Sequence, residues 1–157
     1  MSQPALTREG LAVALFNLLQ TVPGIKTFSR TWRNFDEVPV VNQPALLLTK
    51  GGEKPIQSAE GQRTGWKFEY LVTLYAYQQA SDNSIPPSTQ INNLMDAIEA
   101  VLAPVKAGPA GYPGSVQVLG DLTGRIRHAW IEDTVISDEG VLGPQSFLLF
   151  TIEIEIR

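Results

Sequence analysis

Residues 66–79 read WKFEYLVTLYAYQQ, a long stretch in which side chains of different character alternate. Alternation with a period of two is typical of a β-strand, whose successive side chains point to opposite faces of the sheet. One face would consist of Trp66, Phe68, Tyr70, Val72 and Leu74, and we expect this face to be core. The other face would carry Lys67, Glu69, Leu71, Thr73, Tyr75 and Tyr77, which is more apolar than a plain solvent face requires.

Further strands are expected on both sides of this one. Before it, KTFSRTWRN at 26–34 and ALLLT at 45–49 favour strands, and the polar, turn-rich residues 50–65 predict a projecting loop between strands. After it, we expect strands near 115–119, 125–136 and 147–157. The last of these alternates isoleucine with charged residues, which predicts a strand with Glu153 and Glu155 on an exposed face.

Two amphipathic helices are predicted. In residues 6–24 the helical stripe consists of Leu11, Leu15, Leu18, Leu19 and Val22. Thr7 is a suitable N-cap and Pro23-Gly24 ends the helix. Val13 and Phe16 lie off the stripe, so this helix is expected to contact something on a second side. The second helix, in residues 91–102, has the cleanest stripe: Ile91, Leu94, Met95, Ile98, Val101 and Leu102.

The resulting order α-β-β-β-α-β-β-β predicts an α+β fold, with two helices packed on one face of a mixed, mostly antiparallel sheet. A length of 157 residues fits a single domain over 1–157 with a substantial core. The chain has no cysteine, no signal-like start and no apolar run long enough to span a membrane, so we expect a soluble protein made in the cytoplasm.

The net charge of −4 is unevenly distributed. Residues 1–67 hold eight Lys/Arg and five Asp/Glu, giving +3, and residues 68–157 hold four and eleven, giving −7. An acidic chain is a poor general binder of nucleic acid, because phosphate affinity comes mostly from lysine and arginine. The asymmetry is either without consequence or the sign of two complementary surfaces.

The motifs of catalysis are missing. The single histidine, His128, has no serine or carboxylate at a known catalytic spacing, and we interpret it as structural. Glu153 and Glu155 could lie near Glu132 or Asp133 and form a hard-cation site, but carboxylates on such a strand usually only solvate it. No phosphate-binding glycine spacing occurs. We therefore expect no catalytic residue, no metal, no cofactor and no enzymatic activity.

Residues 27–48, TFSRTWRNFDEVPVVNQPALLL, interleave cations and aromatics, as grooves for single-stranded nucleic acid do. The acidic Asp36 and Glu37 that follow argue against this role. The alternative is that the aromatics pack in the core, while the cations reach an edge or a partner. We therefore expect an oligomer or partner interface, to which we assign Arg30, Trp32, Arg33, Tyr75 and Tyr77.

Residues 18–48 resemble the tail terminator, or tail completion, proteins of long-tailed bacteriophages. The similarity consists of a Leu-rich helix ending in Val22-Pro23-Gly24, then Ser29-Arg30, Phe35-Asp36 and Val38, and then QPAL at 43–46. The helix at 91–104 and the ending FTIEIEI are similar to the second helix and final strand of that family. The loops at 51–65 and 106–114 match no pattern of the family.

The resemblance implies a lambda-like terminator fold and a homohexameric ring in the virion, at the junction of tail and neck. Such a ring caps the tail tube protein, ends tail polymerisation and presents a surface to the head–neck connector protein, while DNA passes through the lumen without specific binding. It implies no membrane partner. The alternatives are another head–tail joining (neck) protein or, from a different class, a small α+β ligand-binding domain or enzyme.

Overall fold

The computed structural model describes residues 6–77, 88–106, 115–116, 119, 126–138 and 145–156. Along the chain the helices and strands are α1 (Arg8–Leu19), β1 (Thr27–Ser29), β2 (Ala45–Gln57), β3 (Arg63–Tyr77), α2 (Ser88–Leu102), β4 (Val105–Lys106), β5 (Ser115–Val116), β6 (Ile126–Asp138) and β7 (Gln145–Ile156). Two 3₁₀ turns, η1 (Phe35–Glu37) and η2 (Val40–Asn42), lie between β1 and β2. The predicted α+β class is confirmed.

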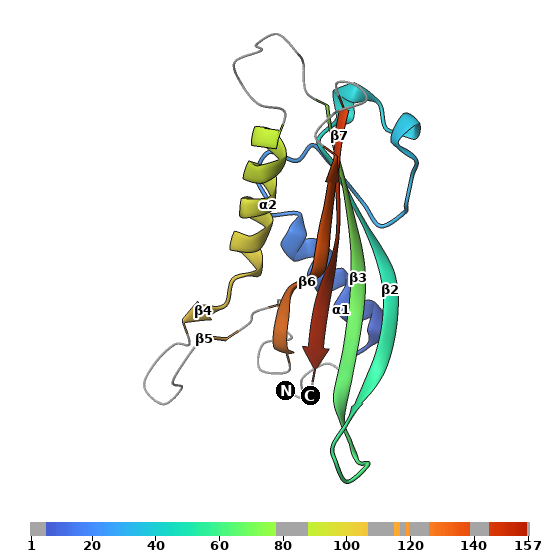
Figure 1. Cartoon of the computed structure of the whole chain (residues 1–157), viewed down its shortest axis with the longest axis vertical. Helices are drawn as coiled ribbons and strands as arrows, with labels where there is room; N and C mark the ends of the chain where they lie inside the picture. The colour runs from blue at the N-terminus through green and yellow to red at the C-terminus, as the bar shows by residue number, and fades with distance from the viewer. Residues whose placement is uncertain are drawn as a thin grey trace.

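Five strands form the main sheet, in the order β1-β2-β3-β7-β6 (Figure 1). Strand β1 pairs with β2 in parallel, and the three other pairs are antiparallel. The sheet is therefore mixed and mostly antiparallel, as predicted. The short strands β4 and β5 pair with each other as a separate two-stranded sheet.

The main core lies between the two helices and one face of this sheet, which we call the helix face (Figure 1). The predicted strand face is confirmed, because Phe68, Tyr70, Val72 and Leu74 are buried there and Trp66 packs against them. Thr7 caps α1 by accepting a hydrogen bond from the Gly10 amide at 2.9 Å. Neither helix in the described part of the chain is long and apolar enough to cross a membrane.

Helix α1 was expected to make a contact through Val13 and Phe16, which lie off its main apolar stripe, and only Phe16 does so among the described residues. Leu11, Leu15 and Leu19 are buried, and Phe16 packs against the same core. Val13 stays 39% exposed.

The opposite face of the sheet, which we call the open face, carries neither α1 nor α2, the two α-helices of the described residues. Its upper end in Figure 1 is covered by the segment that holds η1 and η2. There Val38 is 4% exposed and packs on Ala45, Leu47 and Tyr75, with Phe147 at the margin. This second cluster explains why the outward face of β3 is more apolar than a solvent face.

The predicted strand at 26–34 is wrong beyond Ser29. The Ser29 hydroxyl accepts a hydrogen bond from the Thr31 amide at 3.0 Å and lies 3.1 Å from the Thr31 carbonyl oxygen. Such local contacts offer the backbone an alternative to a strand ladder, and the chain leaves the sheet here. A strand over 26–34 would have placed Phe28, Arg30 and Trp32 on one face. That face does not form, although Phe28 packs against the core.

The predicted loop at 50–65 is also wrong, because β2 and β3 continue through it as a long hairpin that projects from the molecule (Figure 1). Only residues 58–62 form the turn, where Gly61 has a φ of 77° that favours glycine. The ladder shifts register between Lys50 and Glu53, and a side chain at Gly51 would collide with the Glu69 carbonyl. The glycines thus form a β-bulge inside a strand.

Candidate functional site

A cluster of charged and aromatic side chains lies on the open face, at the end opposite to the segment with η1 and η2. Strand β7 lies between β3 and β6, so Glu155 has Lys67 on one side and His128 on the other. Two residues earlier on β7, Glu153 pairs with Trp130. We call these five residues, together with Arg127, the Glu153 cluster.

The carboxylates of Glu153 and Glu155 are both bound by neighbouring cationic or imidazole side chains. Glu153 Oε1 lies 2.9 Å from Lys67 Nζ and 3.3 Å from His128 Nε2. Glu155 Oε1 accepts a hydrogen bond from Arg127 at 2.6 Å, and Glu155 Oε2 lies 3.7 Å from His128 Nδ1. The His128 ring thus bridges two glutamates.

The two carboxylates of the cluster are buried, although no described helix covers them. Glu153 is 4% exposed and Glu155 is 7% exposed. The His128 ring stacks on Trp130, with ring centres 3.6 Å apart and planes 8° from parallel. The Trp130 indole N–H in turn donates to Glu132 at 2.5 Å. The flanking side chains therefore shield the carboxylates from water.

Burial by itself would raise the pKa of Glu153, because it penalises the charged form. The hydrogen bonds and charges of Lys67 and His128 outweigh burial, and the pKa of Glu153 is lowered. The hydrogen bond to Glu153 likewise raises the pKa of Lys67. Glu153 and Lys67 therefore form an ion pair at neutral pH.

The expectation that Glu153 and Glu155 merely solvate an exposed face is wrong, because β7 is an inner strand and not an edge. Glu132 lies across from Thr151 and binds Trp130, so it does not join these carboxylates. The side chain of Asp133 lies outside the described residues.

Within the described part of the chain, His128, Glu153 and Glu155 are the group that could hold a metal ion. One ligand atom from each lies within 4.8 Å of the others. Imidazole and carboxylate are ligands that Zn²⁺ accepts. However, Lys67 and Arg127 already bind the two carboxylates, so an ion would have to displace both cations.

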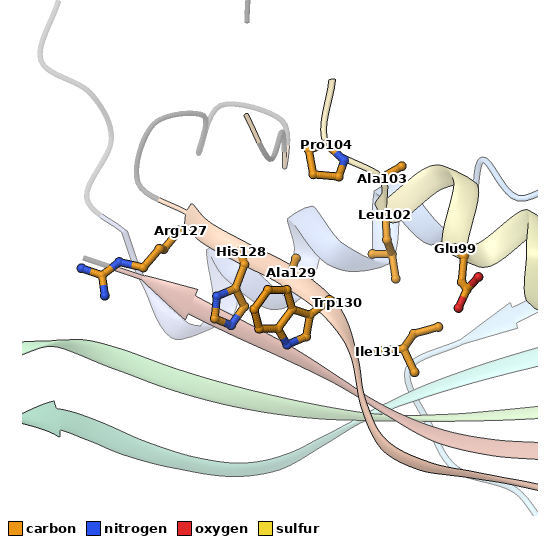
Figure 2. A pocket seen from close by; sticks show the side chains of 9 residues that line it. All are labelled: Glu99, Leu102, Ala103, Pro104, Arg127, His128, Ala129, Trp130 and Ile131. Carbon is orange, nitrogen blue, oxygen red and sulfur yellow. The ribbon is translucent and has the colours of Figure 1, made fainter. Parts of the chain in front are cut away.

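A groove of about 410 Å³ runs between the end of α2 and strand β6 (Figure 2). Figure 2 shows His128 and Trp130 side by side on β6, with Leu102 and Glu99 across the groove on α2. The lining residues are Glu99, Leu102, Ala103, Pro104, Arg127, His128, Ala129, Trp130 and Ile131. None of these described residues carries a hydroxyl or thiol that His128 could activate as a nucleophile.

The predicted interface residues do not all come together. Arg30 makes a two-point contact with Glu9 of α1, at 2.5 and 3.1 Å, and this contact lowers the pKa of Glu9. The Arg30 side chain therefore reaches the helix face of the sheet. Tyr77, the last residue of β3, is half-buried and pairs with Gln145.

Arg33 and Tyr75 do meet. The Tyr75 hydroxyl donates to the Arg33 carbonyl at 3.0 Å, and Phe35 packs edge-on against the Tyr75 ring with centres 5.6 Å apart. Burial, together with the nearby carboxylates of Glu37 and Asp36, raises the pKa of Tyr75. Tyr75 therefore anchors this segment to the open face.

Exposed apolar side chains mark two further surfaces. In the segment after β1, Trp32 is 50% exposed, and Phe35, Val40 and Val41 are also exposed. On β6 the exposed apolar residues are Trp130, Val135 and Ile136. Sequence reasoning singled out only Trp32 among these. The alternation of β6 could have indicated Trp130 and Ile136, but not that β6 lies at an edge.

Searches for related proteins gave matches by structure only. No family model and no curated protein sequence matches the chain. A chain in the virion of a native gene transfer agent particle shares the fold, with a TM-score of 0.51 over 93% of both chains and 10% identity. A second solved chain without a functional description has a TM-score of 0.49 and 11% identity over 98% of this chain and 97% of that one, a superposition too loose to bear on the fold.

Proposed function

We propose that this protein is a structural component of a phage-like virion. The observation that carries the proposal is the fold shared with a chain of a gene transfer agent virion, over 93% of both chains. At 10% identity this similarity concerns the fold, and the function is our inference from it. The resemblance of residues 18–48 to tail terminators is an independent reason for the same class.

Within this class, we propose the role of a tail terminator. The protein would form a homohexameric ring on the tail tube, end tube growth and offer its other side to the head–neck connector. It would be found in the virion at the junction of tail and neck, with DNA passing through the lumen unbound. Such work uses surfaces and no catalysis, so we propose that the protein is not an enzyme.

Two features of the structure support an assembly role. Exposed apolar residues gather in two separate stretches, one after β1 and one on β6. In addition, the charged side chains of the Glu153 cluster and Arg30 are bound within the fold. Exposed apolar surface of this kind usually serves contacts with other proteins.

The test is to mix the purified protein with a phage tail tube subunit. Negative-stain imaging should show tubes capped at one end and six-membered rings, and tube length should fall as the protein is added. An unrelated acidic protein of equal size is the control. The terminator role fails if the tubes grow without limit and no caps are seen.

The rival within the same class is another head–tail joining protein. It predicts that the protein binds isolated head connectors in preference to tubes. Co-sedimentation with each partner separately distinguishes the two roles. Binding to neither partner would contradict the proposed virion role as a whole.

A further inference from the structure

A pocket of about 400 Å³ lies where the start of α1 meets strands β2 and β3. It is separate from the groove in Figure 2, with which it shares no lining residue. Its volume falls in the range of roughly 300–1,000 Å³ that is usual for small-molecule sites. We call it the Tyr70 pocket. Its polar lining residues are Arg8, Glu9, Arg30, Thr49, Lys50 and Tyr70.

The strand register brings charged side chains to the helix face at this pocket. Lys50 of β2 is paired with the core residue Tyr70 of β3, and paired residues of a ladder project to the same face. Glu53 is paired with Phe68, another core residue, so it lies on that face too. In a regular strand, residues three apart would project to opposite faces. The β-bulge at Gly51 therefore places a lysine and a glutamate side by side.

The charges around the Tyr70 pocket do not balance. Glu53 is shared by two cations, because Arg8 Nε lies 2.8 Å from one of its oxygens and Lys50 Nζ lies 2.7 Å from the other. Arg30 is bound to Glu9. Three cations thus face two carboxylates, and one positive charge of this group is left uncompensated.

Hydrogen-bond donors also remain unused. Glu53 contacts only the Nε of Arg8, so the two terminal nitrogens of this guanidinium make no hydrogen bond to the described residues. Lys50 has one contact for its three N–H groups. The side chains of Arg8 and Lys50 are 59% and 47% exposed, and such exposed ion pairs are weak and rearrange easily. An anion can therefore bind here without breaking a buried ion pair, unlike an ion at the Glu153 cluster.

Tyr70 is an independent sign of a ligand. The residue is only 1% exposed, and its hydroxyl makes no hydrogen bond to the described residues. Buried polar groups normally have a partner, because an unpaired one loses its hydration without compensation. Burial raises the pKa of Tyr70 to about 12, so the hydroxyl keeps its proton at neutral pH and is able to donate it. The charges of Arg30, Glu53 and Glu9 act on this hydroxyl, which places it at the charged end of the pocket.

We propose that the Tyr70 pocket binds a small phosphate, either inorganic phosphate or the phosphate group of a small phosphomonoester. Arg8 of α1, Lys50 of β2 and Tyr70 of β3 donate to its oxygens from three different elements. Phosphate accepts hydrogen bonds in tetrahedral directions, so it suits donors that converge from several sides. A planar carboxylate is matched by a single guanidinium fork. Arg30 stays bound to Glu9 and contributes only its charge.

The same geometry disfavours the phosphates of a polynucleotide. Glu9 and Glu53 lie beside the three cations, and they would repel the phosphates on either side of the bound one. A single phosphate group avoids this repulsion. The proposal adds a ligand to this protein and does not depend on its place in a virion.

The test is an NMR titration of the ¹⁵N-labelled protein with glycerol 3-phosphate at pH 7 and constant ionic strength. Amides of residues 8–12, 48–50 and 70 should shift and saturate, with a dissociation constant below about 10 mM. Inorganic phosphate is titrated in parallel. Binding of glycerol 3-phosphate at least three-fold tighter than inorganic phosphate assigns the site to a phosphomonoester, and any other ratio assigns it to free phosphate. Glycerol and acetate should give no saturable shift.

Two variants connect the binding to the pocket. Lys50→Gln should weaken it at least five-fold. Lys54→Gln is the matched control with the same change of charge, because Lys54 is paired with Lys67 and so projects from the open face. It should leave the affinity within two-fold. Tyr70→Phe should weaken binding at least three-fold and leave the urea midpoint nearly unchanged, because the hydroxyl has no hydrogen bond to the described residues to lose.

Three results would overturn the proposal. The first is the absence of a saturable shift with both phosphates. The second is equal weakening by Lys50→Gln and Lys54→Gln, which would show diffuse attraction to the whole protein. The third is binding of acetate as tightly as phosphate, which would exclude phosphate as the preferred ligand.

Discussion

Lys67 Nζ lies 2.9 Å from Glu153 Oε1. This ion pair joins a half-buried cation on β3 to a residue on β7 that is only 4% exposed. The contact exists because the two strands are neighbours in the sheet. It leaves the charge of Glu153 compensated on the face of the sheet opposite to α1 and α2. Stability, pH response and metal affinity all depend on this compensation.

Replacing Glu153 with Gln should destabilise the protein by about 1–2 kcal/mol, because charge-assisted hydrogen bonds to Lys67 and His128 are lost in a buried place. The measurement is urea denaturation at pH 7. Glu69→Gln is the matched control: it lies on the same face, next to Glu153 in the ladder. It should change the free energy of unfolding by less than about 0.5 kcal/mol. Equal effects of the two variants would contradict the role of the pair.

The stability difference between the native protein and Glu153→Gln should depend on pH. The folded pKa of Glu153 is lowered below the reference value of 4.5, so the unfolded state takes up a proton first as the pH falls. The contribution of Glu153 is therefore fully present above about pH 6 and is lost as the pH falls through the folded pKa. Denaturation curves from pH 7 to pH 3 should show the two proteins converging. A difference that grows toward low pH would contradict this prediction.

Removing the Tyr75 hydroxyl should loosen the segment that holds η1 and η2. Tyr75→Phe loses the hydrogen bond to the Arg33 carbonyl and should cost about 1 kcal/mol, because part of that carbonyl can be rehydrated. Amides of residues 34–43 should exchange with solvent several-fold faster. Tyr77→Phe, on the same strand and face, is the control and should leave these amides unchanged. Unchanged exchange in Tyr75→Phe would show that the anchor lies elsewhere.

The protein should not bind single-stranded DNA with micromolar affinity at 150 mM salt. Arg30 is bound to Glu9, and Asp36 and Glu37 follow closely, so only Arg33 remains for phosphate in this segment. Fluorescence anisotropy with a labelled oligonucleotide checks this expectation. Salt-sensitive binding that Arg33→Ala abolishes would restore the nucleic-acid interpretation.

Metal removal should leave the melting temperature unchanged. The carboxylates of Glu153 and Glu155 are already neutralised by Lys67 and Arg127, so folding does not need an ion. The melting temperature should agree within 1 °C before and after dialysis against a chelator. A stoichiometric metal that survives dialysis, whose removal by a stronger chelator unfolds the protein, would contradict this prediction.

The sequence by itself determined the local features of the fold. The alternation in 66–79 assigned Phe68 and Val72 to the core face, and the stripe of α2 assigned Ile98 to it, as the structure confirms. Periodicity and capping chemistry are local, so they are readable from neighbouring residues alone. They fail where tertiary contacts prevail, as in the hairpin at 50–65, where a bulge permits a glycine-rich stretch to continue as a strand.

Only the tertiary structure decided the surroundings of the charged residues. Alternation put Glu153 and Glu155 on one face of a strand, but their burial depends on which strands lie beside β7, which no local pattern encodes. The same holds for Trp130, whose place at an edge of the sheet follows from the strand order β1-β2-β3-β7-β6. The strand order is set by the packing of the whole sheet against the helices. Which side chains lie beside one another on the sheet is therefore decided only when the chain has folded.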